Sequence, residues 1–189
     1  TMGFAPAAAI GAKIGVPDRP VICLVGDGGL LSVVGALTTA VDLHATIADT
    51  EFLNKAKGVN PEPLKPCIGL NECINRKQVE GLPYACGVST RWAREWELRD
   101  LPSRTSKPRN VLVVGAGPAG TELACQLTEQ GHTVRLWEKA DRVGGLLNVA
   151  AKLRANEKYA TWVQYQAERL ERLGVEVTFG KDVTAADVM

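Results

Sequence analysis

The sequence lacks any strong bias of charge, because 22 Lys and Arg are balanced by 21 Asp and Glu, for a net charge of +1. This balance offers no electrostatic basis for binding nucleic acid or an anionic membrane surface. Aromatic residues make up only 5% of the chain, and no apolar run approaches the roughly 20 residues of a membrane-spanning helix. The Ala-rich opening also lacks the basic start and sustained apolar core of a targeting peptide. The composition therefore predicts a cytoplasmic protein with no nucleic-acid or membrane partner, and it leaves the oligomeric state open.

Cysteine is unevenly distributed. Cys23 and Cys125 lie in apolar runs and are expected to be buried small hydrophobic residues. Cys67, Cys73 and Cys86 cluster in a segment rich in Pro, Gly and Asn. Closely spaced thiolates on glycine-containing loops are typical of iron–sulfur clusters. A reducing cytoplasm disfavours a disulfide, and zinc would favour paired C-x2-C arms, which this segment lacks.

The most informative motif is a glycine-rich turn between an apolar strand and a helix. The strand Asn110–Val114 leads into Gly115, Gly117 and Gly120, and a helix then runs to about Gln130 before a second strand ends at Glu138. The first glycine permits the tight turn, the second lets a pyrophosphate approach the backbone, and the third lets the helix pack closely. Such a turn also arises from packing alone, but here strand, turn, helix, strand and acid occur in order. The acid is placed to accept ribose hydroxyl groups, which favours FAD or NAD over NADP.

A second glycine pair follows the acid, in Arg142-Val-Gly144-Gly145. This arrangement resembles flavoproteins of the glutathione reductase-like class, whose first nucleotide site holds the ADP half of FAD. The predicted dinucleotide contacts are Gly115, Gly117, Pro118, Ala119, Gly120, Glu138, Arg142, Gly144 and Gly145.

The last part of the chain continues the alternation of helix and strand. Residues 156–173 have helical periodicity, Gly174 ends that helix, and residues 175–179 alternate like a strand. We therefore expect an α/β fold with a partial Rossmann-type βαβ domain. A complete doubly wound domain needs more strands, so the chain is expected to be a piece of something longer, truncated at both ends.

Residues 44–189 resemble the C-terminal part of the NADH:flavin oxidoreductases related to trimethylamine dehydrogenase and 2,4-dienoyl-CoA reductase. The resemblance rests on Ile47-Ala-Asp49-x-Glu-Phe52-x-Asn54-Lys55, Pro66-Cys67-Ile-Gly-x-Asn71-x-Cys73, Gly81-Leu-Pro83 and Cys86, followed by a proline-containing linker and the Gly115 motif. It covers about three quarters of the chain. The resemblance implies four segments: a foreign piece at 1–43, a helix like the end of a barrel at 44–66, a cysteine-rich segment and linker at 67–108, and a partial dinucleotide-binding domain at 109–189.

In that family a barrel carries FMN, the cysteines hold a [4Fe–4S] cluster, and the glycine motif binds ADP or FAD. The resemblance implies that Cys67, Cys73 and Cys86 are cluster ligands and that the FMN and substrate sites are not in this chain. Leu70 stands where the second cysteine of the pattern is expected. Another group then completes the site, a [3Fe–4S] cluster forms, or the cluster is lost.

Residues 1–43 resemble the cofactor-binding domain of thiamine diphosphate enzymes such as acetolactate synthase, through Val25-Gly-Asp27-Gly28-Gly29. That resemblance implies Asp27 as a Mg²⁺ ligand. Asn54 falls at an allowed spacing for the second ligand, but the residues before it do not read as a strand, so we interpret the spacing as coincidence. Bound thiamine diphosphate and Mg²⁺ are not expected.

The sequence thus predicts a fragment of a flavin-dependent iron–sulfur oxidoreductase that relays electrons and binds FAD or ADP, joined to a thiamine-enzyme piece in a fusion or mis-joined reading frame. The alternatives are a fragment of a thiamine diphosphate-dependent lyase or synthase, and a non-catalytic nucleotide-binding module or inert chimera. No catalytic residue is assigned.

Overall fold

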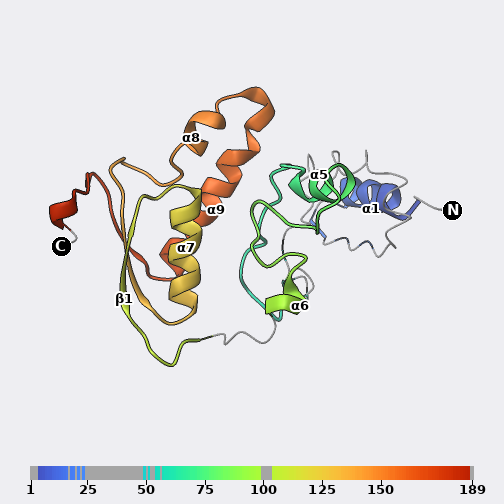
Figure 1. The fold of residues 1–189 in the computed structure, drawn as a ribbon. Coiled ribbons are helices and arrows are strands. Elements are labelled where there is room, and N and C mark those ends of the chain that lie inside the picture. Colours follow the sequence, from blue (N-terminus) through green and yellow to red (C-terminus); the bar gives the residue numbers. More distant parts are fainter. Residues whose placement is uncertain are drawn as a thin grey trace. The chain divides into compact units, whose positions relative to one another are not determined.

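A computed structural model describes residues 4–16, 18, 19, 21, 23, 49, 51, 54, 55, 57–98 and 104–187. It divides the chain into two compact units, Thr1–Trp96 and Glu97–Met189 (Figure 1). Asp27 and the glycines that follow it lie outside the described residues. Cys23 is exposed, so the expectation that it is buried was wrong. The apolar run around Cys23 predicted burial, but burial depends on long-range contacts that the local sequence does not specify.

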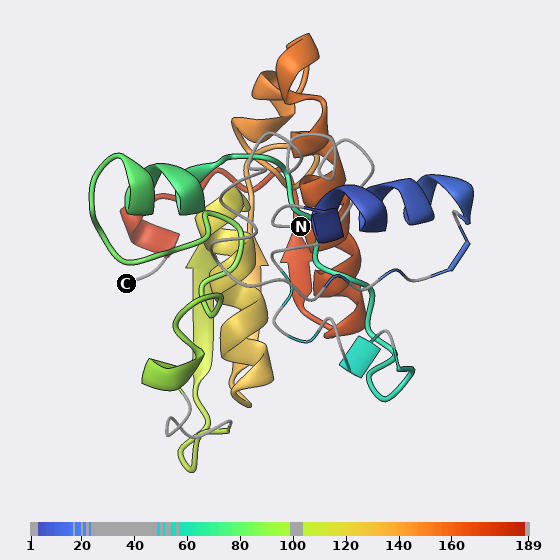
Figure 2. The ribbon, with the colours of Figure 1, turned by 90° about the vertical axis from the view of Figure 1, so that its right-hand side faces the viewer.

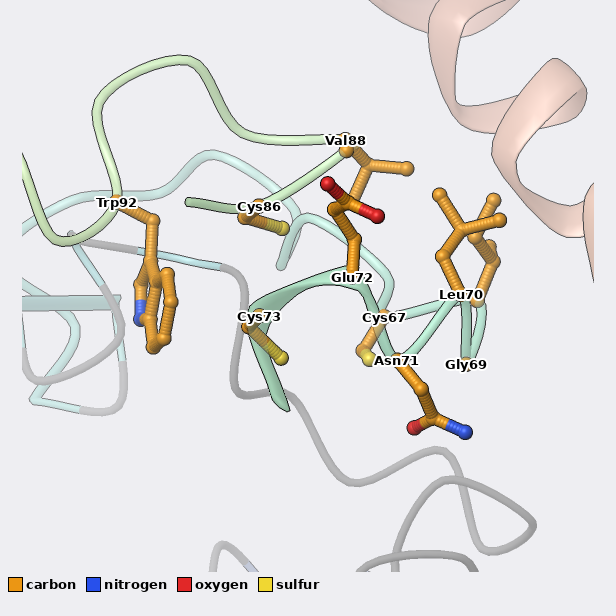
Figure 3. Close-up of a pocket in the computed structure, with 11 residues that line it drawn as sticks. Cys67, Gly69, Leu70, Asn71, Glu72, Cys73, Cys86, Val88 and Trp92 are labelled. Carbon is orange, nitrogen blue, oxygen red and sulfur yellow. The ribbon is translucent and has the colours of Figure 1, made fainter. Parts of the chain in front are cut away.

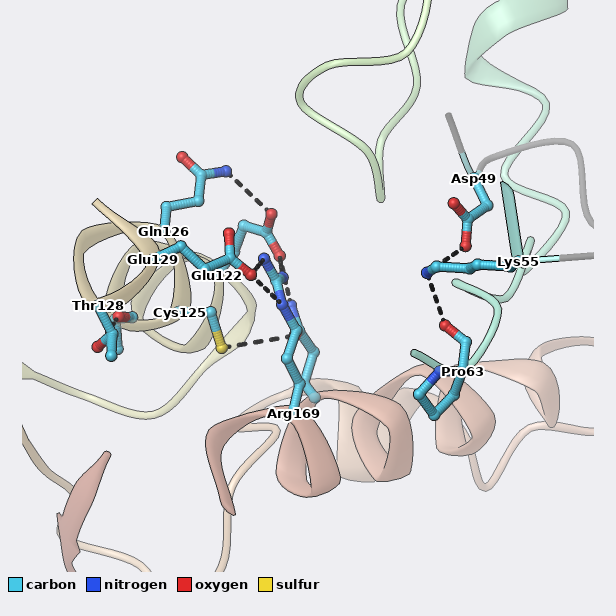
Figure 4. A network of polar contacts seen from close by, with 11 residues as sticks. Asp49, Lys55, Pro63, Glu122, Cys125, Gln126, Thr128, Glu129 and Arg169 are labelled. Atoms are coloured by element: carbon cyan, nitrogen blue, oxygen red, sulfur yellow. Dashed lines mark hydrogen bonds and ion pairs between the residues drawn. The ribbon is translucent and has the colours of Figure 1, made fainter. Parts of the chain in front are cut away.

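The described part of the first unit contains the helices α1 (Phe4–Gly15) and α5 (Glu72–Gln78), and the short helix α6 (Glu95–Leu98) crosses the boundary between the two units. Asp49 anchors the loop between residues 49 and 65, because its carboxylate accepts hydrogen bonds from the backbone N–H of Glu51 at 2.9 Å and of Lys65 at 2.7 Å. The ammonium of Lys55 pairs with the same carboxylate at 2.9 Å and donates to the carbonyl of Pro63 at 2.8 Å (Figure 4). These contacts give Asp49 and Lys55 a structural role.

The second unit is an α/β domain built on a three-stranded parallel sheet in the order β1-β2-β3. The strands are β1 (Asn110–Val114), β2 (Thr133–Trp137) and β3 (Glu176–Thr178), and the helices are α7 (Pro118–Glu129), α8 (Leu147–Ala150) and α9 (Lys158–Arg172), with 3-10 turns at Arg154–Asn156 and Ala185–Asp187. The strands all point toward the end of the domain at which α8 lies (Figures 1 and 2). This is the partial Rossmann-type fold that the sequence predicts.

The core of this domain follows the strand period of two. Val134 and Leu136 of β2 are buried, whereas Thr133 and Arg135 between and before them are exposed. The buried side chains pack against Cys125 of α7, which is completely buried as expected. On α9 the residues at three- and four-residue steps are buried, namely Trp162, Gln166, Arg169 and Leu170. The helical period of the sequence therefore identifies the inward face of α9.

A buried ion-pair network joins α7 to α9 (Figure 4). The guanidinium of Arg169 pairs with Glu122 at 2.8 Å and with Glu129 at 2.8 Å, and Gln166 donates to Glu122 at 2.6 Å. The side chains of Arg169 and Glu122 are only 11% and 14% exposed. Burial alone would lower the pKa of Arg169, but the charges of the two carboxylates outweigh burial and raise it above its ordinary value.

None of the described helices is long and apolar enough to cross a membrane.

Candidate dinucleotide site and cysteine loop

The glycine-rich turn after β1 has the geometry that its sequence spacing requires. Gly115 has φ +95°, a conformation that side-chain-bearing residues rarely adopt. A Cβ on Gly120 would lie 1.9 Å from the carbonyl oxygen of Gly115, so only glycine allows α7 to approach the turn this closely. The turn therefore depends on both residues for its shape.

Open space lies beside Gly117, where no described atom comes within 4 Å of an added Cβ. Gly117 is the N-cap of α7 and supplies no side-chain cap to the first turn of the helix, in which Pro118 is the first residue. Backbone N–H groups of a helix N-terminus attract anions. The structure thus has room and hydrogen-bond donors for a phosphate at this end of α7.

The side chain of Glu138 contacts the glycine-rich turn and is only 7% exposed. Its carboxylate accepts hydrogen bonds from the backbone N–H of Ala140 at 2.8 Å and of Ala116 at 2.5 Å. The bond from Ala140 contributes most to lowering the pKa of Glu138, burial opposes it, and the bond from Ala116 lowers it further. The group is therefore held as a carboxylate that links β2 to the turn, with lone pairs remaining for ribose hydroxyl groups. Sequence reasoning missed these two backbone donors, because an alanine N–H carries no side-chain signal.

The second glycine pair folds back onto the first motif. The N–H of Gly144 donates to the carbonyl of Ala116 at 2.8 Å, and a Cβ on Gly145 would lie 3.2 Å from the Cα of Gly117. Arg142, in contrast, is exposed and bonds to its neighbour Asp141 at 2.8 Å. The structure thus brings the glycines together with Glu138, while it leaves the guanidinium of Arg142 in an exposed pair.

The three clustered cysteines line one hollow in the first unit. Figure 3 shows Cys67, Cys73 and Cys86 on this hollow, together with Leu70 and Trp92. The loop curls because Gly69 has φ +70° and Asn71 has φ +56°, which reverses the chain just before α5. All five cysteines of the chain are thiols. The donor chemistry therefore suits iron–sulfur ligation at three corners.

Leu70 closes part of this hollow by packing on Gly87, since a Cβ on that glycine would lie 2.6 Å from the Cδ1 of Leu70. The cavity that remains has a volume of about 30 Å³, room for no more than a few water molecules. Within the described part of the chain, no three His, Cys, Asp or Glu side chains come close enough to hold a single metal ion.

Asn54 has a structural environment that accounts for it without a metal. Its side-chain amide donates a hydrogen bond to the carboxylate of Glu51 at 2.8 Å. Its backbone carbonyl accepts hydrogen bonds from the backbone N–H groups of Val59 and Asn60. Asn54 and Lys55 are helical, so Asn54 does not end a strand. Its partner in the thiamine-enzyme pattern, Asp27, lies outside the described residues, and the metal site remains a prediction.

Two family models match the chain. The thiamine pyrophosphate enzyme C-terminal TPP-binding domain matches residues 1–55, and the NAD(P)-binding Rossmann-like domain matches residues 113–160. The second match spans β1 to the start of α9, where the glycine turn and Glu138 lie. The chain therefore carries an NAD(P)-binding Rossmann-like domain.

Curated relatives match most of the chain. A metal reductase of Desulforamulus reducens is 35% identical over 146 residues, which are 77% of this chain and 22% of that protein. Dimethylamine dehydrogenase of Hyphomicrobium sp. is 31% identical over 149 residues, 77% of this chain and 19% of that protein. The homologues are members of the dimethylamine dehydrogenase and NADH oxidase family. The resemblance of residues 44–189 to the C-terminal part of these oxidoreductases is thereby confirmed.

A solved structure agrees with this relationship. Histamine dehydrogenase from Rhizobium sp. 4-9 superposes with a TM-score of 0.67 and 28% identity, covering 75% of this chain and 21% of that one. The chain spans about a fifth of the length of the relatives it matches.

Proposed function

We propose that this chain is the iron–sulfur and dinucleotide-binding portion of a flavin-dependent oxidoreductase, with a role in electron relay. The observation that carries the proposal is the glycine turn, in which Gly117 has open space beside a helix N-terminus and Glu138 lies beneath it. Names of relatives such as dimethylamine dehydrogenase and NADH oxidase support the oxidoreductase class. The FMN site of the whole enzyme is expected to lie outside this chain.

The residues have distinct roles in this proposal. Backbone N–H groups at the start of α7 would bind the pyrophosphate of FAD or ADP, and Glu138 would accept the ribose hydroxyl groups. Cys67, Cys73 and Cys86 would hold a cluster through their thiolates, and such a cluster supplies one-electron transfer. The four-segment division of the chain is part of the same proposal.

We expect the purified chain to bind FAD, ADP or NAD, and Glu138→Arg to weaken that binding at least tenfold. The substitution removes the acceptor for the ribose hydroxyl groups and places a positive charge where a carboxylate stood. Thermal shift and calorimetry with each ligand measure the effect. Because Glu138 also holds two backbone N–H groups, the folded state of the variant is checked by circular dichroism. Absence of any ligand-induced shift in the native protein would contradict the dinucleotide proposal.

The match of residues 1–55 to a thiamine pyrophosphate enzyme domain supports a second candidate, a fragment of a thiamine diphosphate-dependent enzyme. The same calorimetric experiment includes thiamine diphosphate with Mg²⁺. Binding that disappears in Asp27→Ala would favour this candidate, whereas the environment of Asn54 leads us to expect none.

We expect Leu70→Cys to stabilise a four-iron cluster against oxidation. In the native chain three thiolates hold three corners, so the fourth iron is labile and a three-iron form is expected after exposure to air. The substitution supplies a thiolate at the C-x2-C position and also removes the side chain that packs on Gly87. Iron and sulfide analysis with electron paramagnetic resonance, on protein prepared anaerobically, distinguishes the two forms. Well-folded native protein without iron would contradict the cluster proposal and leave the dinucleotide proposal standing.

A further inference from the structure

The hollow in the cysteine loop offers thiolates for three corners of an iron–sulfur cluster, so a four-iron cluster needs a fourth ligand of another kind. Leu70 stands where the second cysteine of the pattern is expected, and its side chain packs on Gly87. A leucine side chain has no donor atom. Clusters accept ligands other than cysteine, as the histidines of Rieske centres show. Another residue that lines the hollow can therefore complete the site.

Among the described residues that line the hollow, Asn71 and Glu72 are the two with a side-chain oxygen. Asn71 is exposed, and in Figure 3 its amide points away from the sulfur atoms of the three cysteines. The same figure shows the carboxylate of Glu72 on the side of the hollow where Cys86 lies. A carboxylate is also the stronger iron ligand, because it is anionic and an amide oxygen is neutral. Glu72 is thus the lining residue best suited to bind iron.

The backbone that gathers the cysteines also places Glu72. Gly69 and Asn71 have positive φ, which reverses the chain just before α5, and Glu72 is the first residue of that helix. It directly precedes Cys73, one of the expected cluster ligands. Because Glu72 belongs to the same short turn, its position is fixed together with the positions of Cys67 and Cys73.

The carboxylate of Glu72 is held only loosely by its ion pair. Its Oε1 lies 3.9 Å from the guanidinium of Arg76, one helical turn away, and the side chain of Glu72 is 45% exposed. An ion pair of this length and exposure contributes little to stability. The side chain can therefore turn toward a cluster at small cost.

We propose that Glu72 is the fourth ligand of the cluster, with a carboxylate oxygen on the iron that lacks a thiolate. This inference rests on the function proposed above, in which Cys67, Cys73 and Cys86 hold the other three corners. Each ligand binds a different iron atom, so the four groups do not have to meet at one point. Thiolate is the ligand that iron–sulfur clusters select, so the iron bound to Glu72 is the most easily lost of the four.

The test compares the full native chain with Glu72→Gln, a change that keeps the size of the side chain and removes its charge. Both proteins are prepared anaerobically, and iron and sulfide are measured. We expect about four irons and about four sulfides per native chain, and about three irons with about four sulfides in Glu72→Gln. Mössbauer spectra of isotope-enriched native protein should show one iron that differs from the others, and this iron should be missing from Glu72→Gln.

Two further variants separate a ligand from a structural residue. Glu80→Gln makes the same substitution at an exposed glutamate that is not among the residues lining the hollow and that accepts a hydrogen bond from Asn75 at 2.9 Å. It should keep about four irons, like the native chain. Glu72→Cys supplies a thiolate at the proposed position, so it should also keep about four irons, now without the distinct one. Circular dichroism checks that every variant is folded.

The inference and the proposed function fail in different ways. If Glu72→Gln keeps the native iron content, or if the native chain itself lacks the fourth iron, Glu72 is not a ligand, and the cluster proposal stands without it. Loss of all iron in Glu72→Gln that Glu72→Cys restores supports the inference. Loss that Glu72→Cys does not restore shows that Glu72 only shapes the loop, and overturns it. Folded native protein without iron contradicts the cluster proposal itself, and this inference with it.

Discussion

Replacing Gly120 by alanine is expected to lower the free energy of unfolding of the second unit by about 3 kcal/mol or more, the upper range for overpacking. The new Cβ would lie 1.9 Å from the backbone carbonyl oxygen of Gly115, and the backbone fixes the positions of both atoms, so no side-chain rotation relieves the clash. Relief therefore requires α7 to move away from the sheet. Alanine is the better helix former by about 1 kcal/mol, but this gain is smaller than the expected steric cost. Urea unfolding followed by circular dichroism measures the change.

Gly117→Ala is the matched control, since it makes the same substitution in the same motif. No described atom lies within 4 Å of its Cβ and its φ is −71°, so the expected cost is less than about 1 kcal/mol, mainly from the weaker N-cap preference of alanine. The same Cβ would occupy the space proposed for a pyrophosphate, so this variant should keep its stability and lose affinity for dinucleotide. Equal stability losses in the two variants would contradict the packing role of Gly120.

Arg169→Met is expected to cost about 3–5 kcal/mol, the range for removing one partner of a buried ion pair. Glu122 would keep a nearly buried carboxylate, 14% exposed, with its counter-charge lost. The double variant Arg169→Met/Glu122→Met should recover much of the loss, because apolar residues of similar size often replace a buried pair without cost. Denaturant unfolding of the two single variants and the double variant gives the coupling energy.

Arg135→Met serves as the surface comparison. Its pair with Glu176 has a similar N–O distance of 3.2 Å, but the two side chains are 63% and 66% exposed. A pair of this kind contributes at most about 1 kcal/mol, and usually less. A loss at Arg169 as small as the loss at Arg135 would show that the network between α7 and α9 adds little to stability.

The sequence by itself determined the local elements of the second unit and their order. The G-x-G-x-x-G spacing, the strand alternation and the helical period each act over a few residues, so β1, α7, β2, α9 and β3 lie where these patterns predict. Only the tertiary structure decided which residues distant in the sequence contact one another. It placed Ala116 and Ala140 on the Glu138 carboxylate, because backbone donors have no side-chain signature. It also brought Gly145 against Gly117 and left the side chains of Leu146, Val149 and Leu153 exposed, since long-range contacts and burial depend on the path of the whole chain.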